Sequence, residues 1–125
     1  MTALKIKTAI ILFGHGSRDA LWHLPIQAVA QRIRLSSPTT TVVCAYLELT
    51  EPTLLATAAD LANSGVTHIS ILPMFLGVGR HAREDLPALT SELKHNQPQV
   101  EFKVLATVGE HPEVIDLLAK IALSS

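Results

Sequence analysis

Four short runs of apolar residues, rich in β-branched side chains, alternate with longer stretches whose apolar residues follow a helical spacing. The short runs occupy residues 8–13, 40–47, 67–73 and 100–106. Short apolar runs with few polar positions are typical of strands that are covered on both faces of a sheet. The pattern therefore predicts four β-strands that alternate with helices.

The stretches after the short runs predict four helices, at residues 20–35, 51–64, 81–95 and 112–123. Pro25 is tolerable only in a first turn, so the first helix should be short or bent there. Thr50 is expected to cap the second helix, with Pro52 in its first turn and Gly65 at its end. In the third helix, Pro87 is expected to mark the start of the regular part.

A strand-helix unit repeated four times predicts one α/β domain over residues 1–125. Its four-stranded parallel sheet should be joined by right-handed crossovers, which place helices on both faces. We expect the strand order 2-1-3-4. Ligands of such sheets bind beyond the carboxyl ends of the strands, where the strand order reverses. That point lies here between the first and the third strand.

Residues whose side chains could bind metal or transfer protons follow three of the predicted strands. His15 stands between Gly14 and Gly16 directly after the first strand, Glu48 ends the second, and His81 follows the third. Neighbouring parallel strands end at one edge, so the topology should bring these side chains to one crevice. Two imidazoles and a carboxylate suit a divalent first-row metal ion, and they also suit proton transfer. The alternative is that each histidine only occupies a tight turn or a helix start.

Three of the five arginines flank the two histidines, namely Arg18, Arg80 and Arg83. Together they could give a near-neutral protein a local positive rim for a polyanionic ligand. They could equally be ordinary solvated side chains, because Asp19, Glu84 and Asp85 offset their charge. The sequence leaves both interpretations open.

Composition excludes several other classes of protein. The formal net charge of −1 offers no global field for nucleic acid or an anionic membrane, so neither partner is expected. The single cysteine, Cys44, excludes an internal disulfide and a cysteine-based zinc cluster, and we expect it in the core. The apolar segments are too short for a signal peptide or a membrane span. These features predict a cytoplasmic protein.

The remaining histidines and the tryptophan support weaker hypotheses. His111 precedes the last predicted helix and is interpreted as a helix cap rather than a functional group. His23, His68 and His95 are interpreted as surface or packing residues. Trp22, near the first turn of the first helix, either lines the cleft or packs against a partner subunit.

Three segments in order resemble one family. They are "HGSRD" after the first strand, "YLELTEPTL" after the second and "LPMFLGVGRHAREDLP" after the third. In this order and spacing they resemble the class II tetrapyrrole chelatases. The similarity is greatest to the small, single-domain sirohydrochlorin cobaltochelatases of the CbiX type, which are related to the sirohydrochlorin ferrochelatases. It extends from about Ala9 to Leu118.

The resemblance implies insertion of Co²⁺ or Fe²⁺ into sirohydrochlorin without ATP, in cobalamin or siroheme biosynthesis. It implies no cofactor beyond the metal substrate. His15 and His81 match the family's active-site histidines, and Glu48 matches its metal-site glutamate. The three rim arginines would then bind the carboxylates of the macrocycle, while Gly77 and Gly79 would make a covering loop pliable. Because longer members fuse two such domains around one cleft, the resemblance also implies a homodimer.

Three alternatives to this function remain. The metal could be nickel, since cobalt, iron and nickel all accept imidazole and carboxylate ligands. The same ligands would serve a carrier of metal or tetrapyrrole that performs no insertion. A histidine phosphatase also places a histidine after its first strand, but that chemistry requires an arginine immediately before it. Gly14 occupies this position and argues against a phosphatase.

Overall fold

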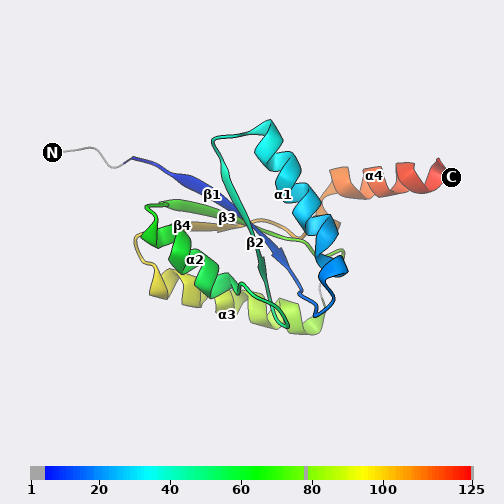
Figure 1. The fold of residues 1–125 in the computed structure, drawn as a ribbon. Helices are drawn as coiled ribbons and strands as arrows, with labels where there is room; N and C mark the ends of the chain where they lie inside the picture. The colour runs from blue at the N-terminus through cyan, green and yellow to red at the C-terminus, as the bar shows by residue number, and fades with distance from the viewer. Residues whose placement is uncertain (1–4, 78, 125) are drawn as a thin grey trace.

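The computed structural model describes residues 5–77 and 79–124. Its four strands form one parallel sheet in the order β2-β1-β3-β4, which confirms the predicted α/β fold (Figure 1). The elements follow as β1 (Thr8–Gly14), the 3-10 helix η1 (Ala20–His23), α1 (Leu24–Ser36), β2 (Thr41–Tyr46), α2 (Leu54–Asn63), β3 (His68–Pro73), α3 (Arg80–Asn96), β4 (Glu101–Val104), the 3-10 helix η2 (Val108–Glu110) and α4 (Pro112–Leu123).

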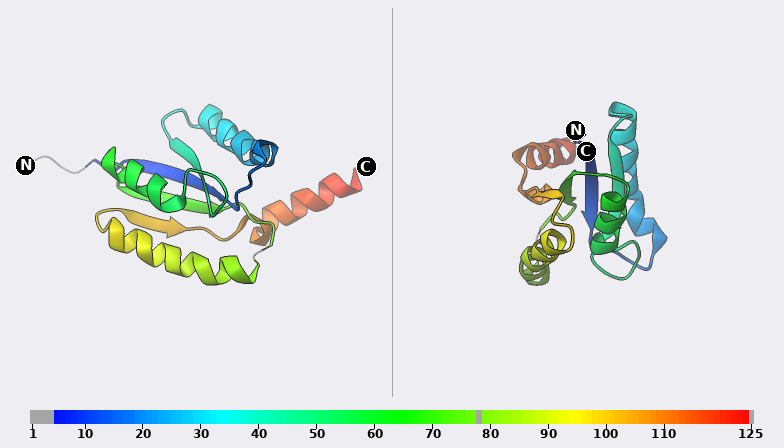
Figure 2. Two further views of the ribbon diagram at one scale, coloured as in Figure 1. Left: turned by 60° about the horizontal axis from the view of Figure 1, so that its bottom comes forward. Right: turned by 90° about the vertical axis from the view of Figure 1, so that its left-hand side faces the viewer.

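Three helices cover the sheet, and they divide between its two faces. Helix α1 packs over β1 and β2 on one face, whereas α2 and α3 pack on the other (Figures 1 and 2). The chain steps from β1 to β2 in one direction across the sheet and from β2 to β3 and β4 in the other. Right-handed crossovers therefore place α1 and the α2–α3 pair on opposite faces.

Side chains of the central strand β1 alternate between two apolar cores. Ile11 and Phe13 belong to the larger core beneath α2 and α3, where Leu93 of α3 is also fully buried. Leu12 points to the smaller core beneath α1 and packs with Ile26. A strand buried on both faces has no polar alternation, which explains why its sequence is a continuous apolar run.

The three longest strands end level with one another. Gly14 at the end of β1 lies beside Tyr46 at the end of β2, and Phe13 lies beside Pro73 at the end of β3. The segments that follow β1, β2 and β3 consequently leave the sheet at one edge. This register places the segment after each of the three strands where ligands of such sheets bind.

Helix α4 differs from the three helices that cover the sheet. None of its residues is buried, and both figures show it extending away from the sheet, beyond the edge where the strands end (Figures 1 and 2). The segment before α4 is held by two hydrogen bonds. The backbone nitrogen of Gly109 donates to the oxygen of Phe75, and His111 Nε2 lies 2.7 Å from the oxygen of Ala106. The chain therefore enters α4 pointing outward.

The start of α2 differs from the sequence prediction. The cap is Thr53, whose Oγ1 accepts a hydrogen bond from the nitrogen of Ala56 at 3.2 Å. Thr50 does not cap, because its hydroxyl donates to the oxygen of Glu51 at 3.5 Å. Pro52 precedes the helix, and its peptide bond with Glu51 is cis. Both threonines satisfy the capping preference, so sequence alone did not distinguish them.

The predictions for the two prolines in helices differ in how well they agree with the structure. Pro25 lies in the first turn of α1, after the short helix η1, which confirms its predicted place in a first turn. Pro87 lies inside α3, whose helical backbone already begins at Arg80, so Pro87 does not mark the start of the regular helix. The residues before it are helical because the nitrogen of Arg83 already donates to the oxygen of Gly79.

Cys44 lies half-buried against the smaller core, as expected. Burial raises the pKa of its thiol, and the nearby Arg34 opposes this change only partly. A raised pKa keeps the thiol protonated at neutral pH, which makes it a packing residue rather than a nucleophile. Within the part of the chain that the structure describes, no helix has the length and apolar character needed to cross a bilayer.

Leu93→Ala should lower the free energy of unfolding by about 2–5 kcal/mol, because it leaves a cavity between α3 and the sheet. Leu93 is only 1% exposed. Leu35→Ala is the matched control, since Leu35 is 69% exposed on α1, and it should change stability by less than about 0.5 kcal/mol. Urea unfolding of both variants measures the difference. Equal effects would contradict the described packing of α3.

Candidate functional site

The side chains of His15 and Glu48 pair at the edge where the strands end, with 3.0 Å between Nε2 and Oε1. The two side chains are 60% and 56% exposed. The segments that follow β1 and β2 are also joined by backbone hydrogen bonds, which continue the pairing of these two strands beyond the sheet. The nitrogen of Leu47 donates to the oxygen of Gly14 at 2.9 Å, and that of Glu48 to the oxygen of His15 at 3.1 Å. The backbone thus fixes both residues of the pair.

Of the two glycines beside His15, Gly16 is required by this close approach. Gly16 has a φ of +99°, and a Cβ there would collide with the backbone oxygen of Glu48. A Cβ on Gly14 would meet the Ile26 side chain at 3.2 Å. The Gly-His-Gly sequence therefore allows the segment after β1 to lie tightly against the segment after β2.

The surroundings of His15 determine which ring nitrogen is available for chemistry. Its ring packs edge-on to Phe75, with 6.3 Å between centroids, and Phe75 in turn packs against Phe13. Because a carboxylate only accepts hydrogen bonds, a neutral His15 carries its proton on Nε2 beside Glu48. Nδ1 then holds a lone pair that can bind a metal ion or accept a proton.

A pocket of about 290 Å³ opens beside His15, with a largely apolar wall. Trp22 contributes to that wall while remaining 73% exposed, which agrees with the first of the two roles predicted for it. The full lining is Gly14, His15, Gly16, Trp22, His23, Pro25, Ile26, Tyr46 and Met74. A pocket that combines one imidazole with aromatic and aliphatic side chains suits a flat, mostly apolar ligand that carries a few polar groups.

His23 also lines this pocket, and sequence reasoning missed it. Its ring lies over the ring of Tyr46, with 4.5 Å between centroids. Its Nε2 is buried and has no hydrogen-bond partner among the described residues. No spacing in the sequence signals this position, because it depends on η1 turning the chain back toward the end of β2. A buried ring nitrogen without a partner is available to a ligand or a water molecule.

The predicted convergence of His81 with His15 and Glu48 stays a prediction. His81 occupies the first turn of α3, after the segment that follows β3, but its side chain lies outside the described part of the structure. The described side chains contain no group of three histidine, cysteine, aspartate or glutamate residues placed to hold a metal ion. They bring together two of the three predicted ligands.

The three rim arginines are all exposed, and their surroundings differ. Arg18 follows His15 in the segment between β1 and η1. Arg80 pairs with Glu84, with 3.2 Å between Nε and Oε1, as the solvated alternative supposed. Arg83 lines a second pocket, of about 350 Å³, between α3 and β4. Binding of a polyanion by these side chains therefore stays a hypothesis.

Gly77 and Gly79, predicted to give a loop its pliability, lie in the segment between β3 and α3. Both are exposed, and a Cβ added at either position would meet no atom within 4 Å. Neither glycine is required for a close approach, unlike Gly16. Their predicted role in loop movement stays a prediction.

His111 is the N-cap residue of α4, as interpreted, but its side chain makes no capping hydrogen bond. Its Nε2 lies 2.7 Å from the oxygen of Ala106, where it stabilises the segment around η2 instead. This contact could not be predicted, because it depends on how the chain turns between β4 and α4. His111 therefore helps to direct α4 outward.

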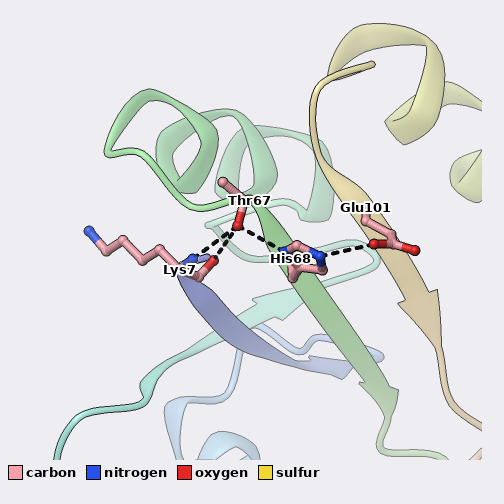
Figure 3. A network of polar contacts seen from close by, with 4 residues as sticks. All are labelled: Lys7, Thr67, His68 and Glu101. Atoms are coloured by element: carbon pink, nitrogen blue, oxygen red, sulfur yellow. Dashed lines mark hydrogen bonds and ion pairs between the residues drawn. The ribbon is translucent and has the colours of Figure 1, made fainter. Parts of the chain in front are cut away.

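His68 forms a second histidine–glutamate pair at the opposite edge of the sheet (Figure 3). Its Nε2 lies 2.9 Å from Glu101 Oε2, and its Nδ1 lies 2.8 Å from Thr67 Oγ1. The nitrogen of Lys7 donates to the same threonine oxygen at 2.9 Å. This network ties the beginnings of β1, β3 and β4 together, which agrees with the structural role expected for His68.

The fold and the site together define a class of protein. A doubly wound α/β sheet presents a histidine–glutamate pair and an apolar pocket at the point where its strand order reverses. Within that class, the CbiX family model matches residues 9–124. The chain belongs to the CbiX family.

Related sequences carry two kinds of name. The sirohydrochlorin cobaltochelatase of Methanococcoides burtonii is 32% identical over 106 residues, which cover 85% of this chain and 79% of that protein. The sirohydrochlorin cobaltochelatase of Methanopyrus kandleri is 33% identical, over 65% of this chain and 57% of that protein. The chloroplastic sirohydrochlorin ferrochelatase of Arabidopsis thaliana is 26% identical over 87% of this chain, which spans only 48% of its length.

Solved structures agree with this assignment. A CbiX protein from Marinobacter aquaeolei VT8 superimposes with a TM-score of 0.80 at 29% identity, over 94% of this chain and 95% of that one. SirB from Bacillus subtilis, solved with Fe³⁺, gives a TM-score of 0.76 at 26% identity over 92% of this chain. This chain matches 46% of the SirB chain, so SirB is about twice as long as the matched unit.

Gly16→Ala should lower the free energy of unfolding by about 1–3 kcal/mol, because alanine is strained at a φ of +99° and collides with the segment that carries Glu48. Gly77→Ala is the matched control in another exposed loop, where the added Cβ meets no neighbour. It should change stability by less than about 0.5 kcal/mol. Urea unfolding of both variants checks this, and equal stability would exclude the tight approach of the two loops.

Proposed function

We propose that this protein is a chelatase that inserts a divalent metal ion, Co²⁺, into sirohydrochlorin in the cytoplasm. The observation that carries the proposal is the His15–Glu48 pair, 3.0 Å apart at the switch point of the sheet beside an apolar pocket. Membership of the CbiX family and the names of the related cobaltochelatases support the metal and the substrate. The ferrochelatase names keep Fe²⁺ as the alternative metal, with Ni²⁺ after it.

Insertion requires that two pyrrole N–H protons leave the macrocycle and that the metal ion exchange its water for nitrogen ligands. Neutral His15, oriented by Glu48, offers Nδ1 as a ligand or as a proton acceptor. One nitrogen cannot do both at the same moment, so a second group is needed. We assign that part to His81, with the two histidines sharing metal delivery and proton removal. No further cofactor is needed for this exchange.

We further propose that the working unit is a homodimer whose two copies face each other across one cleft. The pocket beside His15 has a volume of about 290 Å³, at the lower end of the range for ligand sites, so one copy offers only part of a site for a macrocycle. SirB, which is about twice as long, supports a cleft built from two such units.

His15→Ala and His81→Ala should each lower the steady-state insertion rate by 100-fold or more. The double variant should be little worse than the worse single one, because residues that act as a unit are not additive. The measurement follows the absorbance of sirohydrochlorin with Co²⁺, against a reaction without protein. His95→Ala, an exposed histidine on α3, is the matched control and should retain the wild-type rate.

Near-wild-type rates for His81→Ala at saturating metal would remove His81 from the mechanism. A single turnover per protein, with no further product, would identify a carrier instead of an enzyme.

Replacing Arg18, Arg80 or Arg83 singly with glutamine should raise the Michaelis constant for sirohydrochlorin several-fold. Charge-assisted hydrogen bonds to carboxylates are strong, whereas exposed positions contribute little to folding. The melting temperature should therefore stay within about 2 °C of the wild-type value. Arg32→Gln on α1, which is also exposed, is the control. Unchanged Michaelis constants for all three would show that they are solvated charges only.

A further inference from the structure

Helix α4 exposes an apolar face to water. Five large apolar side chains on it are exposed, and four of them precede its last residue, Leu123: Ile115 at 52%, Leu117 at 55%, Leu118 at 43% and Ile121 at 58%. With 3.6 residues per turn these four share one broad side of the helix, with Glu113 and Lys120 near its border and Asp116 opposite. A helix of 12 residues is only marginally stable in water without a packing partner. The apolar face therefore requires a cover that its own chain does not supply.

The sheet has an uncovered strip of matching size. On β3 and β4 the residues facing α2 and α3 are buried, but Ser70 and Leu72 on the opposite side are half-exposed and Lys103 is exposed. Helix α1 lies on this side mainly over β1 and β2, and from β3 Leu72 reaches the edge of its core. Over the start of the strip lies a pocket of about 400 Å³, lined by His68, Ile69, Ser70, Glu101, Phe102 and Lys103.

The strip and the helix fit each other in size. Two strands span about 10 Å, which is the diameter of one helix with its side chains. The 12 residues of α4 span about 18 Å, and the six residues of β3 span about 20 Å. One helix placed beside α1 would complete the layer on this face of the sheet.

We propose that α4 of one copy covers the β3–β4 strip of a second copy, and that the exchange is reciprocal. Both surfaces belong to the same chain, so a two-fold axis satisfies both at once. Helix α4 continues outward roughly along the direction of β4 (Figure 2). If the partner presents its own carboxyl edge, α4 runs antiparallel to the partner's strands, as a helix of a doubly wound sheet does.

Charge supports the same orientation. An antiparallel α4 brings its first turn, with Glu113 near the border of the apolar face, to the carboxyl end of the strip, where Lys103 is exposed. Its last turn, with Lys120, then lies toward Glu101 at the start of β4. The exchange also holds the two His15–Glu48 edges face to face. This inference rests on the dimer of the proposed function and adds the surface that forms it.

The test measures the dimer dissociation constant by sedimentation for the wild-type protein and for Leu118→Glu and Ile121→Glu. Each substitution should raise the constant at least 100-fold, because it places a carboxylate in an apolar contact. Leu35→Glu, at an exposed leucine of α1 outside the surface, should leave it unchanged. Circular dichroism confirms that each variant folds.

A charge exchange tests the strip itself. Lys103→Glu and Glu113→Lys should each weaken the dimer about tenfold, and a chain that carries both should recover most of the affinity. If Leu118→Glu dissociates the dimer but Lys103→Glu does not weaken it, α4 pairs with the partner's α4 and the proposed strip is wrong. A dimer that survives both apolar substitutions overturns helix exchange and leaves the dimer standing. A wild-type protein that is monomeric overturns both the helix exchange and the dimer. The insertion assay tests the proposed metal insertion separately.

Discussion

The pairing of β1 with strands on both of its sides is the constraint on which the rest of the structure depends. Because β2 and β3 flank β1 in parallel and end level with it, three separate segments leave the sheet at one edge. Two backbone hydrogen bonds beyond Gly14 then fix His15 against Glu48. Both cores also meet at β1, since Ile11 and Leu12 pack on opposite faces. A disturbance of β1 would therefore reach the site and both cores together.

Sequence was sufficient for the fold wherever burial alone determines the pattern. The four strands are apolar because they are covered, and their alternation with helices implies the order β2-β1-β3-β4. Sequence was insufficient where two residues satisfy the same local rule, as Thr50 and Thr53 do at the start of α2. Sequence also did not indicate that α4 extends away from the sheet, because an apolar helix face does not identify the surface that it contacts.

Some features of the candidate site could likewise be predicted from sequence, and others could not. The meeting of His15 with Glu48 follows from strand order, so it could be predicted. Two other contacts could not be predicted: the packing of His23 against Tyr46 and the contact of His111 with Ala106. Both depend on short turns around η1 and η2, and such turns produce no periodic pattern of apolar residues in the sequence. The role of His81 was inferred from its place after the third strand and from the family resemblance, and it stays a prediction because its side chain lies outside the described residues.

The exposure of the His15–Glu48 pair has a consequence for how metal would pass through the site. Ion pairs in contact with solvent contribute about 0–1 kcal/mol, so Glu48 can exchange its histidine partner for an arriving cation with little loss of free energy. A rigid, enclosed set of ligands would retain the ion. An open pair of this kind favours brief residence and rapid handover, which suits a cation that is cargo rather than a permanent part of the protein.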